Sequence, residues 1–416
     1  MKHYDLIVAG GGLTGVAAAV SAARDGLSVL LIEKSGCLGG AMSNCLVYPF
    51  MMYWERDPKS GLRRNLSAGI FTEMRERQAA KARGDADTLE PEYYKFILDD
   101  MVIEAGVDVL FHGTIYDIVT QDRKVKSVTA ATKSGALTIE ADFFADCTGD
   151  GELFSMAGCA YQLGRESDGL CQPMTTCFRM ANVDLAGFYQ ERSQIQRLYK
   201  QYQEEGKLEN PRENVLIFPG LGDGILHFNT TRVIQLDPTD AFDVSRAEME
   251  ARRQVYEMVC FLKENFKAFE KSTIVSIACE IGVRESRKLK GEHILTADEL
   301  KNCVEFEDTI ALGNYDIDIH NPSGTGTEIY SFKPGEHYRI PYRSLLPKEY
   351  DNLLAAGRCI SATHEAQAAI RIMPICACLG EAAGTAIALA HDTGRTTHTI
   401  DMGALRQRLR EKGAAL

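Results

Sequence analysis

The stretch from Tyr4 to Glu33 constrains the fold of this chain more than any other segment. It opens with the apolar run LIVA, whose length and β-branched members are typical of a buried strand. Gly10, Gly12 and Gly15 follow at the spacing G-x-G-x-x-G, and an alanine-rich segment then predicts a helix to about Arg24. A strand that leads through close glycines into a helix is the first half of a dinucleotide-binding βαβ unit.

A second apolar run, Ser28 to Ile32, predicts the next strand, and Glu33 stands at its end. Glu33 lies 18 residues after Gly15 (33 − 15), close to the spacing of about 20 expected for the acid of a dinucleotide site. Its carboxylate can accept hydrogen bonds from both ribose hydroxyls of an adenosine. A glycine-rich turn that binds nothing is the alternative, but strand, helix, strand and terminal acid together favour an ADP site.

Each glycine of the motif has a separate predicted role. Gly10 permits the tight turn off the strand, Gly12 lets the backbone approach a pyrophosphate, and Gly15 allows close packing of helix on strand. The helix N-terminus adds free N–H groups and a partial positive charge. We therefore expect the cofactor to contact Gly10, Gly12, Leu13, Thr14, Gly15, Glu33 and Lys34.

The size and charge of the chain limit its function classes. Its 416 residues exceed one ordinary domain, so we expect two. The formal net charge of −12 argues against general binding to nucleic acid or to anionic membranes, and the sequence has no basic run or long apolar span. The N-terminal MKHYDLIV enters the first strand without a signal-peptide pattern, so we expect a cytoplasmic protein.

The twelve cysteines are scattered through the chain. They form no C-x-x-C motif and lack the short paired spacings of zinc sites, so we expect no metal. In a reducing compartment they are expected to be free thiols, mostly buried small residues. Only Cys37, Cys45, Cys376 and Cys378 are candidates for positions near the cofactor.

Two segments after the second strand extend the predicted site. Gly39 and Gly40, within GCLGGAMS, permit a loop that lies close to a ligand. The mostly apolar run from Cys45 to Trp54, which Pro49 interrupts, either lines a cavity or belongs to the core. Of these two interpretations we favour the core.

The remainder of the first region predicts helices over 67–83 and 92–104 and a β-meander over 117–138. The strand FFADC follows, and it ends in the turn TGDG at residues 148–151. This turn returns the chain to the first site. Taken alone, it is better explained as a plain β-turn.

From about residue 154 to 335 the pattern changes. The sequence predicts amphipathic helices over 181–205 and 245–269 and a hairpin over 215–234. The glycine cluster of this hairpin has the wrong spacing for a second dinucleotide site, so we interpret it as a turn. A separate cap or substrate domain is expected over 154–335.

The last third returns to nucleotide-binding character. The apolar strand NLLAAG ends at Gly357 and Arg358. A helix of small residues is predicted from about Leu379, and Pro374 lies just ahead of it as a common starting signal. Small residues allow this helix to pack closely against a sheet or a flat ligand.

Six motifs cover both ends and part of the middle of the chain: YDLIVAGGGLTG with Glu33, LGGAMS, ADCTGDGE, GVRESRKLKGE, IPYRSLLP and NLLAAGRCISATHEAQAAIRIMPICACLGEAAG. Together they resemble the bacterial FAD-dependent oxidoreductases, whose nucleotide fold is distantly shared with fumarate reductase and succinate dehydrogenase flavoproteins. In such proteins the first motif holds the ADP half of FAD. The C-terminal strand and helix contact the ribityl chain and the flavin.

The resemblance implies further cofactor contacts, which are Gly39, Gly40, Ala41, Met42, Thr148, Gly149, Asp150, Gly357, Arg358, Pro374 and Cys376. Two departures from the family pattern matter. Arg358 follows Gly357 where many flavoproteins have Asp, which puts the ribityl contact in question. The histidine that links flavin covalently in fumarate reductase relatives has no counterpart near Gly39 and Gly40, so we expect non-covalent FAD.

His364 and Arg371 lie seven residues apart, about two helical turns, ahead of the small-residue helix. Fumarate reductase relatives carry a His and an Arg in the corresponding stretch. This implies His364 as a proton or hydrogen-bond donor and Arg371 as an anchor for an anionic or carbonyl oxygen. Arg284 and Arg287 are weaker candidates for the same pocket. Alternatively, Arg371 pairs with a structural carboxylate and His364 is a core histidine.

We therefore expect an α/β flavoenzyme. Residues 1–153 and 336–416 would form a Rossmann-like FAD-binding domain of the three-layer ββα type, with an α+β cap inserted at 154–335. The expected reaction is hydride transfer between non-covalently bound FAD and a small organic substrate, with an unidentified electron donor or acceptor. An NAD-dependent dehydrogenase, an electron-transfer subunit without its own substrate and a flavin-binding sensor remain alternatives, and a homo-oligomer is compatible with the sequence.

Overall fold

The computed structural model describes residues 2–416, and its largest sheet has a parallel part in the order β5-β2-β1-β8-β19. Its strands are β1 (His3–Ala9), β2 (Val29–Glu33), β5 (Asp108–Phe111), β8 (Gly135–Asp146) and β19 (Leu353–Ala355). Every residue of β2 is buried, as is typical of a parallel strand covered on both faces. Because these strands are parallel, their C-terminal ends meet at one edge, where ligands of such sheets bind.

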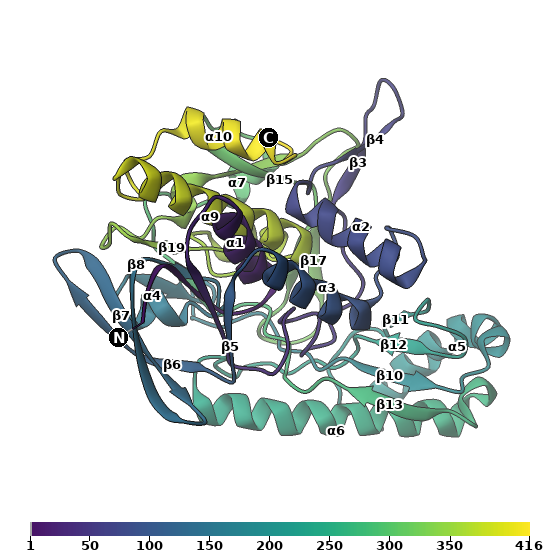
Figure 1. Cartoon of the computed structure of the whole chain (residues 1–416). Helices are drawn as coiled ribbons and strands as arrows, with labels where there is room; N and C mark the ends of the chain where they lie inside the picture. The colour runs from purple at the N-terminus through teal and green to yellow at the C-terminus, as the bar shows by residue number, and fades with distance from the viewer. Residues whose placement is uncertain (1) are drawn as a thin grey trace.

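Helix α1 (Leu13–Arg24) and helix α9 (Met373–Thr393) lie side by side and pack against one face of this sheet (Figure 1). The two backbones are in direct contact, because a Cβ atom on Gly380 would overlap the carbonyl oxygen of Thr14. A Cβ atom on Gly384, one turn later in α9, would overlap the backbone of α1 in the same way. The small residues predicted to allow close packing therefore hold α9 against α1.

The opposite face of the sheet is covered by the predicted meander. Strands β6 (Thr114–Gln121) and β7 (Lys124–Thr132) continue the sheet antiparallel to the first half of β8, and α4 (Glu152–Met156) contacts β6 and β8. A second group of buried apolar residues fills the space between the parallel strands and the meander. This arrangement confirms the predicted α/β fold of the Rossmann-like FAD-binding type.

Two predicted helices of the first region are present. They are α2 (Ile70–Ala82) and α3 (Pro91–Glu104), which contact each other. Strands β3 (Trp54–Arg56) and β4 (Arg63–Asn65) form a hairpin that projects from the body of the protein (Figure 1).

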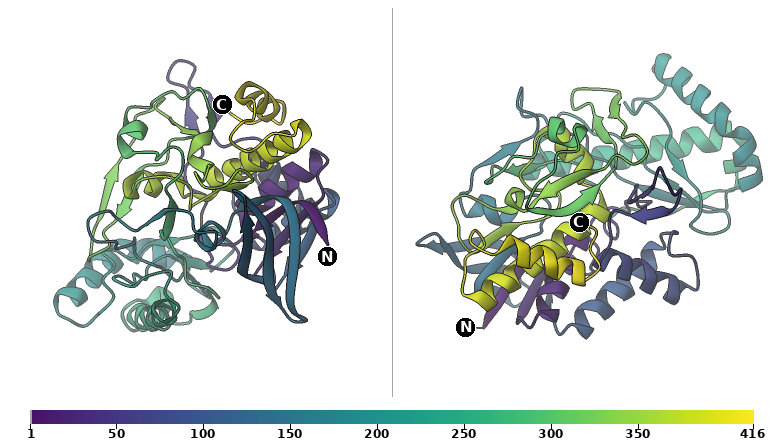
Figure 2. Two further views of the ribbon diagram at one scale, coloured as in Figure 1. Left: turned by 90° about the vertical axis from the view of Figure 1, so that its left-hand side faces the viewer. Right: turned by 90° about the horizontal axis from the view of Figure 1, so that it is seen from above.

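A second, antiparallel sheet lies to one side of the first, in the order β11-β12-β10-β13 (Figure 2). Its strands are β10 (Phe178–Ala181), β11 (Ile217–Phe218), β12 (Leu226–Phe228) and β13 (Thr273–Ile277). The long helices α5 (Leu185–Glu204) and α6 (Ala241–Asn265) and the short helix η1 (Lys267–Phe269) pack on it. The predicted helices over 181–205 and 245–269 and the hairpin over 215–234 are thus confirmed.

The separate core of this second unit is smaller than the cap predicted over 154–335. Its buried apolar residues lie between Phe178 and Phe269. By contrast, buried residues from Leu295 to Ile340 join the core that contains α1 and α9. The limits of the separate core therefore lie inside the predicted range 154–335 and do not coincide with its ends.

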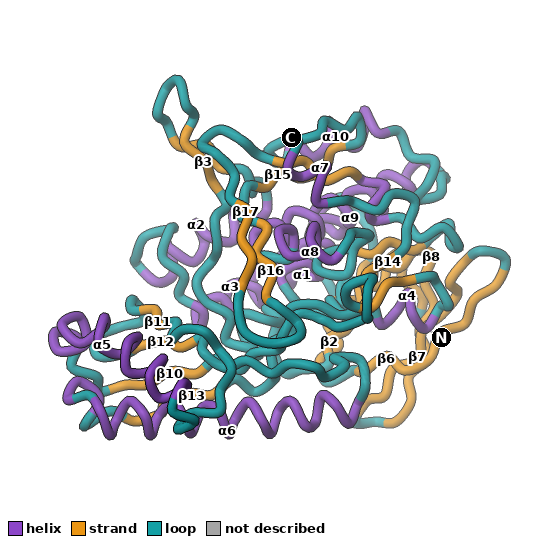
Figure 3. The backbone as a smooth tube through the Cα atoms, turned by 180° about the vertical axis from the view of Figure 1, so that it is seen from behind, coloured by secondary structure: helices purple, strands orange, loops and turns teal. Residues whose placement is uncertain are grey.

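Ten further elements complete the fold, and the hairpin of β16 and β17 is visible from behind (Figure 3). They are β9 (Tyr161–Leu163), β14 (Arg287–Leu289), α7 (Ala297–Lys301), β15 (Thr309–Gly313), β16 (Ile317–His320), β17 (Thr327–Tyr330), β18 (Tyr338–Pro341), η2 (Tyr342–Leu345), α8 (His364–Ile370) and α10 (Met402–Glu411). Helix α9 begins at Met373, earlier than the predicted start near Leu379, and Pro374 lies in its first turn.

Candidate functional site

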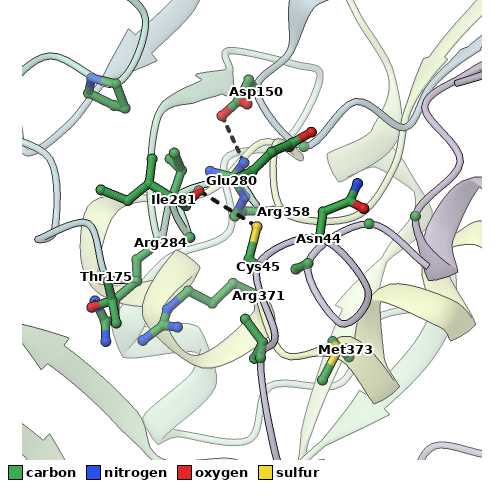
Figure 4. Close-up of a pocket in the computed structure, with 18 of the residues that line it drawn as sticks. Asn44, Cys45, Asp150, Thr175, Glu280, Ile281, Arg284, Arg358, Arg371 and Met373 are labelled. Atoms are coloured by element: carbon green, nitrogen blue, oxygen red, sulfur yellow. Dashed lines mark hydrogen bonds and ion pairs between the residues drawn. The ribbon is translucent and has the colours of Figure 1, made fainter. Parts of the chain in front are cut away.

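One cavity of about 1110 Å³ runs from the glycine turn after β1 to the second sheet. Its walls come from segments that are far apart in sequence, among them the Gly39 loop, the 148–150 turn, the start of α9 and the β16 hairpin. Asp150 and Met373 mark two of these segments in Figure 4. A volume of this size is at the upper end of the range for small-molecule and cofactor sites.

The three glycines of the first motif occupy three different environments. Gly10 has φ +94°, and a Cβ there would lie 2.6 Å from the carbonyl oxygen of Cys147. A Cβ on Gly15 would overlap the carbonyl oxygen of Gly10, so this position needs glycine for packing. A Cβ on Gly12 would have only the Cα of Gly40, at 3.9 Å, within 4 Å and would project into open space. Gly12 is therefore where a ligand can approach the backbone.

Glu33 is buried at the end of β2, and its carboxylate lines the cavity. Its Oε2 accepts a hydrogen bond from the N–H of Gly11 at 2.6 Å, and its Oε1 accepts one from the N–H of Ser35 at 2.7 Å. A carboxylate has about four acceptor positions, so two remain for other donors. The neighbouring Lys34 also lines the cavity and lies 3.5 Å from Glu280.

The loop around Gly39 packs directly on the glycine turn. The N–H of Gly39 donates to the carbonyl of Gly11 at 2.9 Å, and a Cβ on Gly40 would lie 2.9 Å from the Cα of Gly12. Gly39, Gly40 and Ala41 line the cavity. Met42 is instead fully buried in the core and is not among the lining residues, so the predicted contact of Met42 has no support from the geometry.

The 148–150 turn lies beside the glycine turn, where a Cβ on Gly10 would be 2.9 Å from the Cα of Thr148, and it is held by Asp146. This buried carboxylate accepts hydrogen bonds from the Thr148 hydroxyl at 2.7 Å and from the N–H of Phe154 at 2.9 Å. Thr148, Gly149 and Asp150 all line the cavity. The turn therefore lines the same cavity as the glycine turn after β1, and its contact with the cofactor stays a prediction.

Arg358 lines the cavity and forms an ion pair with Asp150, with 2.7 Å between Nη2 and Oδ1. The Ser286 hydroxyl also donates to Oδ1 of Asp150, at 2.6 Å. Burial raises the pKa of the Asp150 carboxyl, but Arg358 and Ser286 outweigh burial and hold that pKa below its ordinary value. Gly357 lies behind Arg358, where a Cβ would be 2.6 Å from the Thr14 hydroxyl.

The N-terminus of α9 opens onto the same cavity. Ile372, Met373 and Cys376 line it, whereas Pro374 is buried in the first turn and is not among the lining residues. The Cys376 thiol donates to the carbonyl of Arg371 at 3.4 Å, and burial raises its pKa to about 12.

The apolar run that begins at Cys45 was expected to belong to the core. Its buried residues Cys45 and Tyr48 do have core-like exposure of 8% each. They nevertheless line the cavity together with Val47, Pro49 and Met51. The preference for the core therefore holds for Leu46 and Tyr53, which are buried and do not line the cavity, whereas Cys45 and Tyr48 both pack in the interior and form part of the cavity wall.

The far end of the cavity, which we call the inner chamber, is rich in polar side chains. It comprises Thr175, Arg212, Asn229, Arg284, Tyr315, Asp318, His320, Thr327 and Arg371. Figure 4 shows the side chains of Arg284 and Arg371 reaching the same part of the cavity. Burial lowers the pKa of Arg284 to about 9, and the positive charges of Arg212 and Arg371 add to this shift.

Asp318 joins three of these side chains. Its Oδ2 accepts from the Tyr315 hydroxyl at 2.8 Å and lies 3.4 Å from Nε2 of His320 and 3.7 Å from Nη2 of Arg371. Burial, with Arg284 nearby, lowers the pKa of His320 to about 3, so its imidazole is neutral at pH 7. Arg371 therefore pairs with a carboxylate inside the chamber, a partner that sequence reasoning did not name.

His364 is buried outside the chamber wall. Its Nδ1 lies 2.7 Å from Oε2 of Glu285, and Glu285 in turn contacts Lys288 at 2.5 Å. His364 is not among the residues that line the cavity, so its predicted contact with substrate or flavin has no support from the geometry. Arg287 does line the cavity and donates to the backbone carbonyl of Asp150 at 3.2 Å.

Comparisons with known proteins assign this chain to a family. A family model described as FAD dependent oxidoreductase matches residues 5–409. No curated protein is significantly similar to the chain. One helix, α9, is long and apolar enough to cross a membrane, but 94% of its apolar window is buried inside the protein.

Solved structures with a related shape are numerous but distant. A geranylgeranyl bacteriochlorophyll reductase-like protein from Thermoplasma acidophilum is 13% identical, with a TM-score of 0.48, over 99% of this chain and 84% of its own. The flavin-dependent brominase Bmp2 is 12% identical, with a TM-score of 0.48, over 99% and 83%. The p-nitrophenol 4-monooxygenase from Pseudomonas putida is 10% identical, with a TM-score of 0.46, over 96% and 83%.

Proposed function

This chain belongs to the FAD-dependent oxidoreductase family, and from that premise we propose that it transfers a hydride between FAD and a small organic substrate bound in the inner chamber. The observation that carries the proposal is the single cavity, which joins the glycine turn after β1 to the polar chamber around Arg284 and Arg371. A cofactor site and a substrate site that share one cavity allow direct transfer between their ligands.

The residues along the first part of the cavity fit FAD. The open side of Gly12 suits the close approach of a pyrophosphate, and the two free acceptor positions of Glu33 suit the ribose hydroxyls. Arg358 and Asp150 offer a charged group and an acceptor farther along the wall, where the ribityl chain is expected. We propose that FAD is held by these contacts without a covalent bond.

Bound FAD would supply the hydride acceptor or donor, while the chain positions the substrate. Arg371 would anchor an anionic or carbonyl oxygen of the substrate, since Asp318 holds its guanidinium at the chamber wall. The N-terminus of α9 adds a partial positive charge beside Met373. The apolar side chains of Val47 and Met51 line the same cavity and would limit the access of water.

Two alternatives fit this geometry less well. An electron-transfer subunit needs no substrate chamber, and a sensor needs no cluster of substrate-sized polar groups beside the flavin site. An NAD-dependent dehydrogenase is excluded by the family, whose cofactor is FAD.

We further propose a distant relation to fumarate reductase flavoproteins, a cytoplasmic location and a separate electron donor or acceptor.

The test is anaerobic titration of the FAD-loaded protein with a panel of metabolites, followed through the flavin absorbance. At least one compound should bleach oxidised flavin or restore the colour of chemically reduced flavin, at a rate that saturates with its concentration. A panel that spans organic acids, alcohols, amines and enones without any such compound would contradict the proposed hydride transfer.

A further inference from the structure

Three arginines converge on the inner chamber from three separate segments. Arg212 lies in the loop before β11, Arg284 in the loop between β13 and β14, and Arg371 directly after α8. All three line the cavity, and Figure 4 shows the side chains of Arg284 and Arg371 in the same part of it. Arg212 is tied to this part through Glu213, which lies 3.9 Å from it and accepts from the Thr327 hydroxyl, while that hydroxyl contacts Nδ1 of His320.

The carboxylates of the protein do not fully neutralise the three arginines. Over residues 2–416, Arg284 makes no ion pair, and its guanidinium donates only to neutral acceptors: the Pro173 carbonyl, the Thr175 hydroxyl and the Asn229 side chain. Asp318 lies 3.7 Å from Arg371 and is the single carboxylate that pairs with it in the described structure.

Arg212 is also incompletely paired. It is buried, with 5% of its side chain exposed, and its Nη1 has no hydrogen-bond partner within the described part of the chain. Its nearest carboxylate is Glu213, at 3.9 Å, but Glu213 lies only 2.8 Å from the fully buried Arg232. Glu213 is thus shared between Arg212 and Arg232, and within the described residues the Arg284 guanidinium has no carboxylate partner at all.

An uncompensated buried charge is costly, and arginine does not relieve this cost by losing its proton at neutral pH. A ligand with negative charge removes the cost, so the chamber is built for an anion. The flat fork of a guanidinium matches a carboxylate with two parallel hydrogen bonds.

We infer that the substrate of this enzyme is an organic acid, which Arg212, Arg284 and Arg371 bind through a carboxylate group. The inference rests on the proposed function, since it names the substrate class of the same chamber. Arg212 was not among the candidates that the sequence suggested.

Binding is tested on the FAD-loaded protein with matched pairs of ligands. Each pair contains a carboxylate and its amide, such as propionate with propionamide and benzoate with benzamide, and methyl phosphate is added as another anion. The readouts are the change in flavin absorbance and the shift in Tm as each ligand is titrated. Carboxylates should bind at least about tenfold more tightly than their amides, since a charge-assisted bidentate pair is lost in the amide.

The variants Arg284→Met and Arg212→Met should each weaken carboxylate binding by about tenfold or more and leave amide binding unchanged. Arg253→Gln is the matched control, because Arg253 is an exposed arginine on α6 that does not line the cavity. It should bind carboxylates like the unaltered protein. If a chamber variant fails to fold or to retain FAD, the ligand pairs on the unaltered protein decide by themselves.

Equal affinity for carboxylates and amides, or preferred binding of methyl phosphate, would overturn the inference. The experiments distinguish failure of this inference from failure of the proposed function. A neutral compound that bleaches the flavin while carboxylates do not bind overturns the inference alone. Carboxylates that bind without any redox change across the metabolite panel overturn the proposed function alone.

Discussion

Nη2 of Arg358 lies 2.7 Å from Oδ1 of Asp150, and this ion pair joins the turn after β8 to the segment after β19. The two residues come from motifs that are 208 positions apart. Both line the cavity, so the pair fixes the relative position of two of its walls. Arginine stands at 358 where many flavoproteins have an acid, and the acid of this pair is supplied by the neighbouring turn.

Asp150→Asn is expected to lower the free energy of unfolding by about 1–3 kcal/mol, because it leaves the guanidinium of Arg358 mostly buried without a counter-charge. Asp168→Asn removes an exposed partner of Arg165, and because solvent screens that pair the loss of stability should be clearly smaller. Chemical denaturation of both variants measures the difference. Equal losses would mean that the buried pair contributes no more than a surface pair.

The effect of Asp150→Asn should depend on pH in a defined direction. The pKa of Asp150 is lower in the folded protein than its ordinary value of 3.8, so the ionised form stabilises the fold above that value. This contribution is lost as the pH falls through the folded-state pKa, because the protonated side chain resembles Asn. The difference in Tm between the two proteins should therefore be constant from pH 5 to 7 and shrink below about pH 4.

Substitutions at Gly12 and Gly15 should have opposite consequences. A side chain on Gly12 has room in the folded protein but enters the cavity, so Gly12→Val should keep the fold and abolish FAD binding. A Cβ on Gly15 meets the backbone of Gly10, so Gly15→Ala should destabilise the protein itself. Circular dichroism and flavin content of the purified variants separate the two effects. Full FAD occupancy in Gly12→Val would contradict the assignment of the pyrophosphate site.

Glu33→Ala is expected to weaken FAD binding by roughly 1–3 kcal/mol, the scale of a lost charge-assisted hydrogen bond. Part of this loss comes from the protein alone, because the N–H groups of Gly11 and Ser35 lose their acceptor. Glu33→Gln keeps an acceptor oxygen, so its affinity for FAD should fall between that of the unaltered protein and that of Glu33→Ala. Fluorescence titration of the apoproteins with FAD gives the affinities, and an unchanged affinity in Glu33→Ala would exclude the ribose contact.

The first part of the site could be predicted from sequence because its chemistry is local. Gly12 and Glu33 belong to one continuous βαβ unit whose spacing follows from the geometry of a strand and a helix. Of the inner chamber, only Arg284 and Arg371 were among the residues that the sequence suggested, since Arg212, Asp318 and His320 come from segments that carry no recognisable motif. Apolar residues such as Tyr48 gave an ambiguous signal for a physical reason: a cavity wall and a core need the same side chains.

The cysteines of α9 are expected to take no part in electron transfer. The Cys376 thiol donates to the carbonyl of Arg371, whereas the Cys378 thiol donates to the carbonyl of Ala68 on another segment. Burial raises the pKa of each to about 12, so both are protonated at neutral pH and poorly reactive. Replacing both by Ser should leave the rate of flavin reduction within about tenfold. A loss of several orders of magnitude would instead indicate a redox-active pair.

Arg371 and His364, which the sequence paired as catalytic candidates, should separate in experiment. Arg371 faces the inner chamber, so Arg371→Met should keep the flavin and slow substrate-driven flavin reduction by about a hundredfold, mostly through weaker substrate binding. His364 is buried against Glu285, so His364→Ala should lower Tm and leave the rate per bound flavin within about tenfold. His364→Gln, which retains a donor for Glu285, should recover part of the Tm. Stopped-flow reduction normalised to flavin content, together with thermal melts, measures both quantities. A hundredfold loss of rate in His364→Ala with an unchanged Tm would show instead that His364 acts in catalysis. It would contradict the structural role that we infer from the contact between His364 and Glu285.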